Sequence, residues 1–169
     1  MREGMCFLMV VKRKAASTFY YEVMPTSLPA SALPLSADEW SLVRLAGKTI
    51  NATTDAGPHE NGVHTMGAAV RAKDGSTFTG VNIYHFTGGP CAELVALGSA
   101  RAAGATELTH IVAVGSHGRG VKSPCGRDRQ IFADYYPQMR VIVETQQGMV
   151  SVLASDLLPF GYDHRAEQV

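Results

Sequence analysis

The first clear alternation of apolar and polar positions along the chain begins at Ser36 and has the period of a helix. Ser36 is followed three residues later by Glu39, which is the capping-box pattern of a helix start. The apolar and small positions that then share one helical face are Trp40, Val43, Gly47 and Ile50. We therefore predict a helix that opens a folded domain and buries this face.

The patterns that follow predict strands and helices in turn. Two β-like runs flank KDGS (73–76), which is typical of a hairpin. An Ala- and Leu-rich run from Cys91 to about Ala103 ends at Gly104 and predicts a helix. Two apolar runs, HIVAVG and RVIVET, are typical of buried strands. A helix that ends at Pro137 is predicted for CGRDRQIFADYY, and a short helix or turn for DLLPFGY. This order indicates a sheet covered by helices, an α/β architecture.

The N-terminal part of the chain has a different composition from the rest. An apolar run, CFLMVV, is followed by KRK and then by MPTSLPASALPLS with its spaced prolines. The apolar run is far too short to cross a bilayer, and a basic triplet stands where a signal peptide would carry small residues. We predict an extension and linker over 1–34, with room for one strand, ahead of a single domain over 35–169.

Length, charge and cysteine content narrow the classes of function. A chain of 169 residues can bury one sizeable core without a metal or disulfide staple. Fifteen basic and fifteen acidic side chains balance, so net charge gives no argument for a nucleic-acid or membrane partner, and a small ligand fits better. The odd count of three cysteines, with Cys6 in an apolar run, indicates a reducing compartment, by default the cytoplasm.

A proline followed directly by a cysteine occurs twice, each time at a predicted helix start. Cys91 follows Pro90 and Cys125 follows Pro124. A thiol in that position lies beside free backbone amides and the positive end of the helix dipole, which favours the thiolate. Two such thiolates from adjacent helices can converge on one Zn²⁺ ion. Taken singly, each cysteine is better explained as a core residue, but the repeated unit favours a shared site.

Two carboxylates accompany these cysteines. Glu93, two residues after Cys91, is placed to move a proton to or from a water without being a ligand. Asp128, three residues after Cys125, projects from the same helical face and could be a third ligand. The alternative is that Asp128 forms an ion pair with an arginine, namely Arg127, Arg129 or Arg119.

Three passages resemble the cytidine deaminase superfamily, most closely its blasticidin-S deaminase branch. They are FTGVNIYHFTGGPCAEL, RGVKSPCGR and LLPFGY, and the likeness runs from about Leu33 to Tyr162. The zinc deaminases carry a Glu two residues after the first ligand and a later P-C-x-x-C. The resemblance implies a three-layer α/β/α fold with a central mixed sheet and a homotetramer. It also implies zinc-dependent hydrolytic deamination of a cytosine nucleoside or blasticidin-S-like antibiotic, giving the uracil product and ammonia.

The resemblance also assigns roles to particular residues. Cys91 and Cys125 would bind zinc, and Glu93 would carry protons to the ring N3 and the departing amine. The residues that it places around the substrate are Asn82 at the sugar, Gly67 and Ala68 at the pyrimidine edge, Ser123 at the leaving amino group, and Tyr84 and Tyr162.

The chain departs from the family pattern at three positions. Asp128 stands where the family has a ligand cysteine, Tyr84 where nucleoside-specific members have a Glu, and His164 where the blasticidin branch has a Trp. If Asp128 binds zinc, the site keeps its formal charge. If Asp128 pairs with an arginine instead, zinc is lost. The alternative function is then a metal-free protein that binds a nucleoside-like ligand or a partner without turnover.

Overall fold

The chain divides into two compact units, Met1–Ala30 and Ser31–Val169. The computed structural model describes residues 9–15, 18–24, 27–57, 63–163 and 166, so Cys6 and His164 lie outside the described residues. In the first unit, β1 (Met9–Ala15) pairs antiparallel with β2 (Thr18–Met24), with Met9 opposite Met24. The N-terminal segment thus contains two paired strands where the sequence suggested one.

The second unit is built on a mixed sheet. Its strands are β3 (Leu33–Pro34), β4 (Met66–Ala72), β5 (Thr77–Val81), β6 (Leu108–Gly115), β7 (Val121–Lys122), β8 (Arg140–Thr145) and β9 (Gly148–Leu153). The order across the sheet is β3-β9-β8-β6-β4-β5, and β7 pairs with the end of β6. The β6–β8 pair is parallel and the other pairs are antiparallel.

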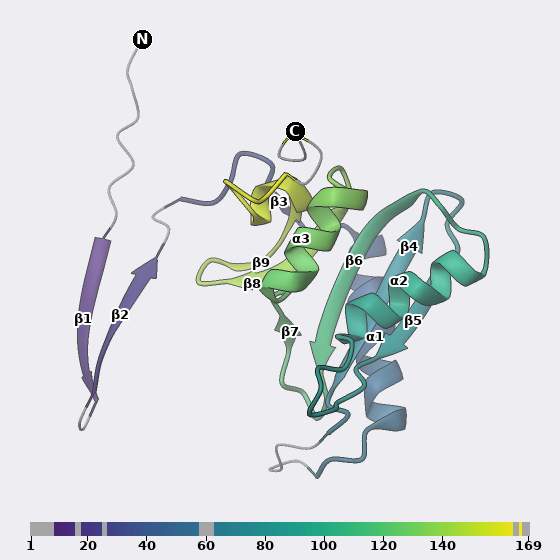
Figure 1. Ribbon diagram of the computed structural model, residues 1–169, viewed down its shortest axis with the longest axis horizontal. Helices are drawn as coiled ribbons and strands as arrows, with labels where there is room; N and C mark the ends of the chain where they lie inside the picture. The colour runs from purple at the N-terminus through teal and green to yellow at the C-terminus, as the bar shows by residue number, and fades with distance from the viewer. Residues whose placement is uncertain (1–8, 16–17, 25–26, 58–62, 164–165, 167–169) are drawn as a thin grey trace. The chain divides into compact units, whose positions relative to one another are not determined.

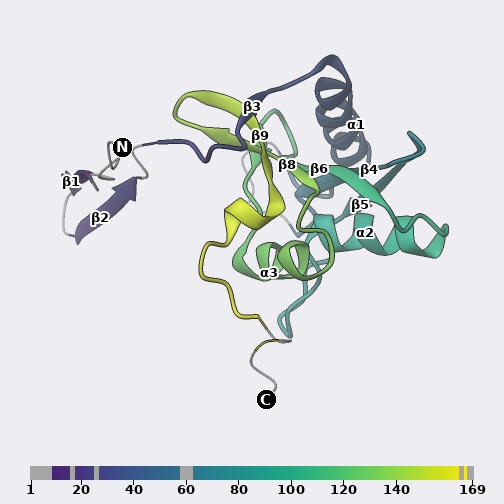
Figure 2. The same cartoon turned by 90° about the horizontal axis from the view of Figure 1, so that it is seen from above.

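Helices cover both faces of this sheet, which confirms the predicted three-layer α/β/α fold. The helices are α1 (Ala37–Thr53), α2 (Ala92–Ala102) and α3 (Gly126–Tyr135), with a short 3₁₀ helix, η1 (Ala154–Leu157), after β9. Figure 1 shows the sheet with α2 and α3 in front of it, and Figure 2 shows α1 on the opposite side. The core between α1 and the sheet is formed by Leu42, Ala46, Ala69, Val112, Val114, Val121 and Ile142. No helix in the described part of the chain has both the length and the apolar character needed to span a membrane.

The start of α1 confirms the predicted capping box, and Ile50 is buried as predicted, but the buried face does not include Trp40. Ser36 and Glu39 exchange hydrogen bonds between their side chains and backbone amides. The prediction for Trp40 is wrong, because Trp40 is 41% exposed, whereas Leu42, Ala46 and Ile50 are buried. The buried face of α1 includes Glu39, whose carboxylate contacts polar partners there, and Trp40 therefore points away from the core.

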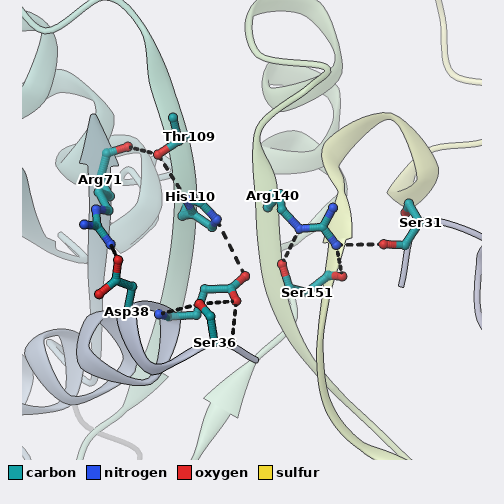
Figure 3. Close-up of polar contacts among 9 residues, drawn as sticks. Ser31, Ser36, Asp38, Arg71, Thr109, His110, Arg140 and Ser151 are labelled. Carbon is teal, nitrogen blue, oxygen red and sulfur yellow. Dashed lines mark hydrogen bonds and ion pairs between the residues drawn. The ribbon is translucent and has the colours of Figure 1, made fainter. Parts of the chain in front are cut away.

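Those partners form a polar network between α1 and the sheet, drawn in Figure 3. The Nε2 atom of His110 lies 3.7 Å from a carboxylate oxygen of Glu39. Ser36 donates to Glu39 Oε2 from its hydroxyl at 2.8 Å, and Arg140 donates to Ser151 Oγ at 2.7 Å. Burial acts to raise the pKa of Glu39, but the hydrogen bonds from Ser151 and Ser36 outweigh it and leave that pKa below its usual value.

Helix α2 lies close against the hairpin of β4 and β5. A Cβ atom on Gly80 would lie 2.4 Å from the backbone nitrogen of Ala96, so only glycine allows this approach. The helix then ends before Gly104, which has a φ of +85° as predicted from its position. Because Cys91 and Glu93 belong to the first turn of α2, this packing fixes where both side chains stand.

Candidate active site

Cys91 and Cys125 are the N-cap residues of α2 and α3, as the repeated Pro-Cys unit predicted. Neither side chain caps its own helix, so both sulfur atoms are available for other contacts. The two Sγ atoms lie 3.6 Å apart although the residues are 34 positions apart in sequence. The two helix starts therefore converge on one point.

Asp128 completes this cluster from the first turn of α3. Its Oδ2 atom lies 3.3 Å from the Sγ of Cys125, and the ligand atoms of the three side chains all lie within 4.8 Å of one another. The Asp128 side chain is fully buried, and its Oδ1 atom has no hydrogen-bond partner among the described residues. A buried carboxylate oxygen without a donor is costly, so this atom calls for a cation or a bound polar group.

Two of the three arginines that could have paired with Asp128, Arg129 and Arg119, donate hydrogen bonds to other groups. Arg129 donates to the carbonyls of Pro124 and Leu157. Arg119 donates to the carbonyls of Thr65 and Ser116 and to the Ser116 hydroxyl. None of the ion pairs found among the described residues involves Asp128.

The electrostatic environment of the cluster is negative. Burial, followed by the charge of Asp128, raises the pKa of Glu93 to about 7. Burial and the neighbouring Asp128 and Cys125 also raise the pKa of the Cys91 thiol. Without a cation, desolvation and like charge thus act against the thiolate that the helix start was expected to favour at Cys91.

The residues present fit a zinc ion. Zinc takes thiolate and carboxylate ligands, and two sulfurs each about 2.3 Å from a zinc ion lie about 3.8 Å apart at a tetrahedral angle. The observed separation of 3.6 Å is close to this value. A cation at this point would also satisfy Asp128 Oδ1 and reverse the repulsion that raises the pKa of Cys91 and Glu93.

A cavity of about 500 Å³ opens above the cluster, which is a suitable volume for a small molecule. Its walls include seven of the predicted site residues: Asn82, Tyr84, Cys91, Glu93, Ser123, Cys125 and Asp128. Glu93 is buried and lies in the same cavity as the three candidate ligands. These four side chains thus lie at one cavity, and their roles in a reaction stay a prediction.

Three predicted substrate residues lie elsewhere. Gly67 and Ala68 are inside the sheet, where both pair with β5 and β6, and neither lines the cavity. Tyr162 borders a separate hollow beside α3, where its carbonyl accepts a hydrogen bond from Gln130 at 2.8 Å. Their contact with a substrate stays a prediction.

Asn82 has a structural task as well as a place at the cavity. Its Oδ1 atom accepts from the backbone amides of Thr65 and Met66, each at 2.9 Å, and its Nδ2 donates to the carbonyl of Val63. Asn82 therefore ties the segment before β4 to the end of β5 at the cavity edge.

Among the described residues that line the cavity, one charged side chain was not singled out from the sequence. Lys122, in β7, lines the cavity two residues before Pro124. The only signal in the sequence was its place in the passage RGVKSPCGR, three residues before Cys125. An exposed lysine is not recognisable as a cavity residue until its neighbours in space are known.

The fold and the cluster together define an α/β/α protein whose helix starts carry a candidate metal centre beside a buried acid. No model of a known protein family matches the chain. Blasticidin-S deaminase from Bacillus cereus is 31% identical over 137 residues, which cover 76% of this chain and 94% of that protein. Cytidine deaminase from Halalkalibacterium halodurans is 37% identical over 98 residues, 56% of this chain and 74% of that protein.

Solved structures agree with these sequence relatives. Cytidine deaminase from Burkholderia pseudomallei is similar with a TM-score of 0.58 at 32% identity, over 73% of this chain and 98% of that one. The Bacillus anthracis cytidine deaminase, at 19% identity and a TM-score of 0.60 over 76% of this chain and 91% of that one, supports the fold alone. The chain belongs to the cytidine deaminase superfamily, near the blasticidin-S deaminase branch.

Proposed function

We propose that the protein is a zinc-dependent aminohydrolase that converts a cytosine nucleoside, or a nucleoside antibiotic of the blasticidin-S type, to its uracil product and ammonia. The observation that carries this proposal is the burial of Glu93 in the cavity that Cys91, Cys125 and Asp128 also line. The blasticidin-S and cytidine deaminases among its relatives support deamination of a cytosine compound.

Cys91, Cys125 and Asp128 would hold the zinc ion, which when bound supplies the Lewis acidity that makes a water nucleophilic near neutral pH. The water adds to C4 of the cytosine ring while Glu93 takes one of its protons and delivers it to ring N3. Glu93 then carries the second proton to the exocyclic amine, and the C4–N bond breaks to release ammonia. The buried position of Glu93 keeps bulk water from exchanging with these protons.

The other cavity residues would bind and orient the substrate. Asn82 and Tyr84 lie on the β5 side of the cavity. Ser123 directly precedes Pro124, which is followed by the candidate ligand Cys125. We assign Asn82 to the sugar, and the carbonyl of Ser123 to the leaving amino group. Gly67, Ala68 and Tyr162 are retained as substrate contacts, and a homotetramer as the assembly, on the family resemblance.

The test of this function is the loss of ammonia release in Glu93→Gln. We expect kcat for cytidine or blasticidin S to fall by about 100-fold or more, because the variant cannot transfer protons. Zinc per chain, measured by elemental analysis, should stay at about one. Glu107→Gln is the matched control, since Glu107 is an exposed glutamate paired with Lys73.

Either of two results would contradict the proposal. Full activity in Glu93→Gln would remove Glu93 from the reaction. Wild-type protein that holds no zinc, takes up none on incubation, and turns over none of cytidine, deoxycytidine and blasticidin S would leave the metal-free binding protein as the better explanation.

A further inference from the structure

The side chains of Arg119 and Lys122 both lie against Gly115, the last residue of β6. A Cβ atom on Gly115 would lie 2.9 Å from the Cβ of Arg119 and 3.4 Å from both the Nε of Arg119 and the Cε of Lys122. Any larger residue would meet the Arg119 side chain and the Lys122 stem. The absence of a side chain at Gly115 therefore lets Arg119 and Lys122 lie over this strand end.

The two cations differ in what they contact. Arg119 donates hydrogen bonds from its guanidinium to the carbonyls of Thr65 and Ser116 and to the Ser116 hydroxyl. Lys122 forms no ion pair with any described residue. Among the described residues that line the cavity, Lys122 is also the only lysine or arginine. Arg119 is thus part of the framework, and Lys122 is a cation available to a ligand.

The position of Lys122 indicates which end of a ligand it would meet. Gly115 pairs with Met66 in β4, and the Met66 carbonyl accepts from the amide of Asn82 at 3.0 Å. Met66 and Asn82 both line the cavity. The side chain of Lys122 therefore lies at the edge of the cavity that the ends of the strands form. The cluster of Cys91, Cys125 and Asp128 lies at the edge that the helix starts form.

We propose that Lys122 recognises an anionic group on the sugar side of the substrate, so that the preferred substrate is a cytosine compound carrying a carboxylate or phosphate. This inference rests on the proposed function, in which the ring is held at the cluster and the sugar at Asn82. An ammonium group in a partly enclosed cavity forms a strong charge-assisted hydrogen bond to either anion. Glu93 and Asp128 line the same cavity, but both belong to the helix-start cluster, where the proposed function holds the ring and not the sugar.

The experiment compares three substrates: neutral cytidine, cytidine 5′-monophosphate and the 5′-carboxylic acid of cytidine. For wild type we expect kcat/KM to be higher for at least one of the two anionic compounds than for cytidine, and the one preferred distinguishes phosphate from carboxylate. In Lys122→Met the ratio of anionic to neutral kcat/KM should fall about tenfold or more, chiefly through KM. Lys122→Arg should restore most of the ratio. Lys73→Met controls for net charge, because Lys73 lies outside the cavity and pairs with Glu107.

An unchanged ratio in Lys122→Met, or wild type that prefers cytidine over both anions, would overturn the inference. If wild type turns over none of the three compounds, calorimetric titration of the same compounds decides the role of Lys122, while the zinc measurement and the assay with blasticidin S decide the proposed function separately. Tighter binding of an anionic compound that is lost in Lys122→Met then supports the role of Lys122, and equal affinities in the two proteins overturn it.

Discussion

Asp128 is the largest of the three departures of this chain from the family pattern, and its environment favours a ligand role. It is fully buried, it contacts the Cys125 thiol, and its Oδ1 atom has no donor among the described residues. A carboxylate in this state is stabilised by a cation more than by any protein group in contact with it. The replacement of a cysteine by Asp128 is therefore compatible with a retained metal centre.

The ligand role predicts different results for two substitutions of Asp128. Asp128→Asn keeps the shape but loses the charge, and we expect it to weaken zinc binding by about tenfold or more. Asp128→Cys restores a third thiolate and should bind zinc at least as tightly as wild type. Titration with Co²⁺, followed by thiolate-to-cobalt absorption, measures both, with Asp134→Asn on the same helix as the control. Equal affinity in wild type and Asp128→Asn would exclude Asp128 as a ligand.

His110 predicts a pH dependence of stability that is separate from activity. Burial lowers the pKa of His110, and Arg71 and Arg140 add to this, while Glu39 and Asp38 act in the opposite direction. Because the folded-state pKa lies below the ordinary value of 6.5, the unfolded chain binds a proton first as the pH falls. The stabilising contribution is thus present above pH 6.5 and is lost on acidification.

We therefore expect the free energy of unfolding to fall between about pH 7 and pH 5 more steeply in wild type than in His110→Gln. Urea denaturation at several pH values measures the difference. Glu39 adds a second loss below its ordinary pKa of 4.5, since its folded-state pKa is lowered. Parallel curves for the two proteins would show that His110 does not contribute.

At the scale of elements, the helix starts and turns were predictable because their signals are local. The capping box at Ser36, the Pro-Cys helix starts and the KDGS hairpin each depend on residues within four positions of one another, and all were confirmed. The strand β9, with the sequence GMVSVL, was missed. It is defined by pairing with β8 on one side and β3 on the other, and these contacts are not visible in its own composition.

The packing of α2 on the hairpin gives a prediction with an internal control. Gly80→Ala places a methyl group against the backbone of α2 and should destabilise the fold by about 1–3 kcal/mol, while displacing Cys91 and weakening metal binding. Gly98 lies within α2 and has open space around it, so Gly98→Ala should be neutral or stabilising by up to about 1 kcal/mol. Thermal unfolding and zinc titration compare the two. Similar effects of both substitutions would contradict the close approach at Gly80.

At the scale of the whole molecule, the limits of the folded domain can be tested by truncation. The Ser31 carbonyl accepts from Arg140 at 2.7 Å, and β3 (Leu33–Pro34) pairs with β9. A chain of residues 31–169 keeps these contacts, whereas a chain of residues 35–169 loses them. We expect the shorter chain to be less stable by about 1–3 kcal/mol in urea denaturation. Equal stability would place the start of the domain at the predicted residue 35 instead.

The sequence alone determined where the three main helices begin, the positions of the two candidate ligand cysteines, and the family. These follow from short motifs, whose physics acts over a few residues. The tertiary structure decided which face of α1 is buried, that Cys91 and Asp128 meet across 37 positions, and that Lys122 reaches the cavity over Gly115. It also decided the pKa of Glu93. Burial and charge at these points depend on residues brought together only by the sheet, so no local pattern in the chain could have supplied them.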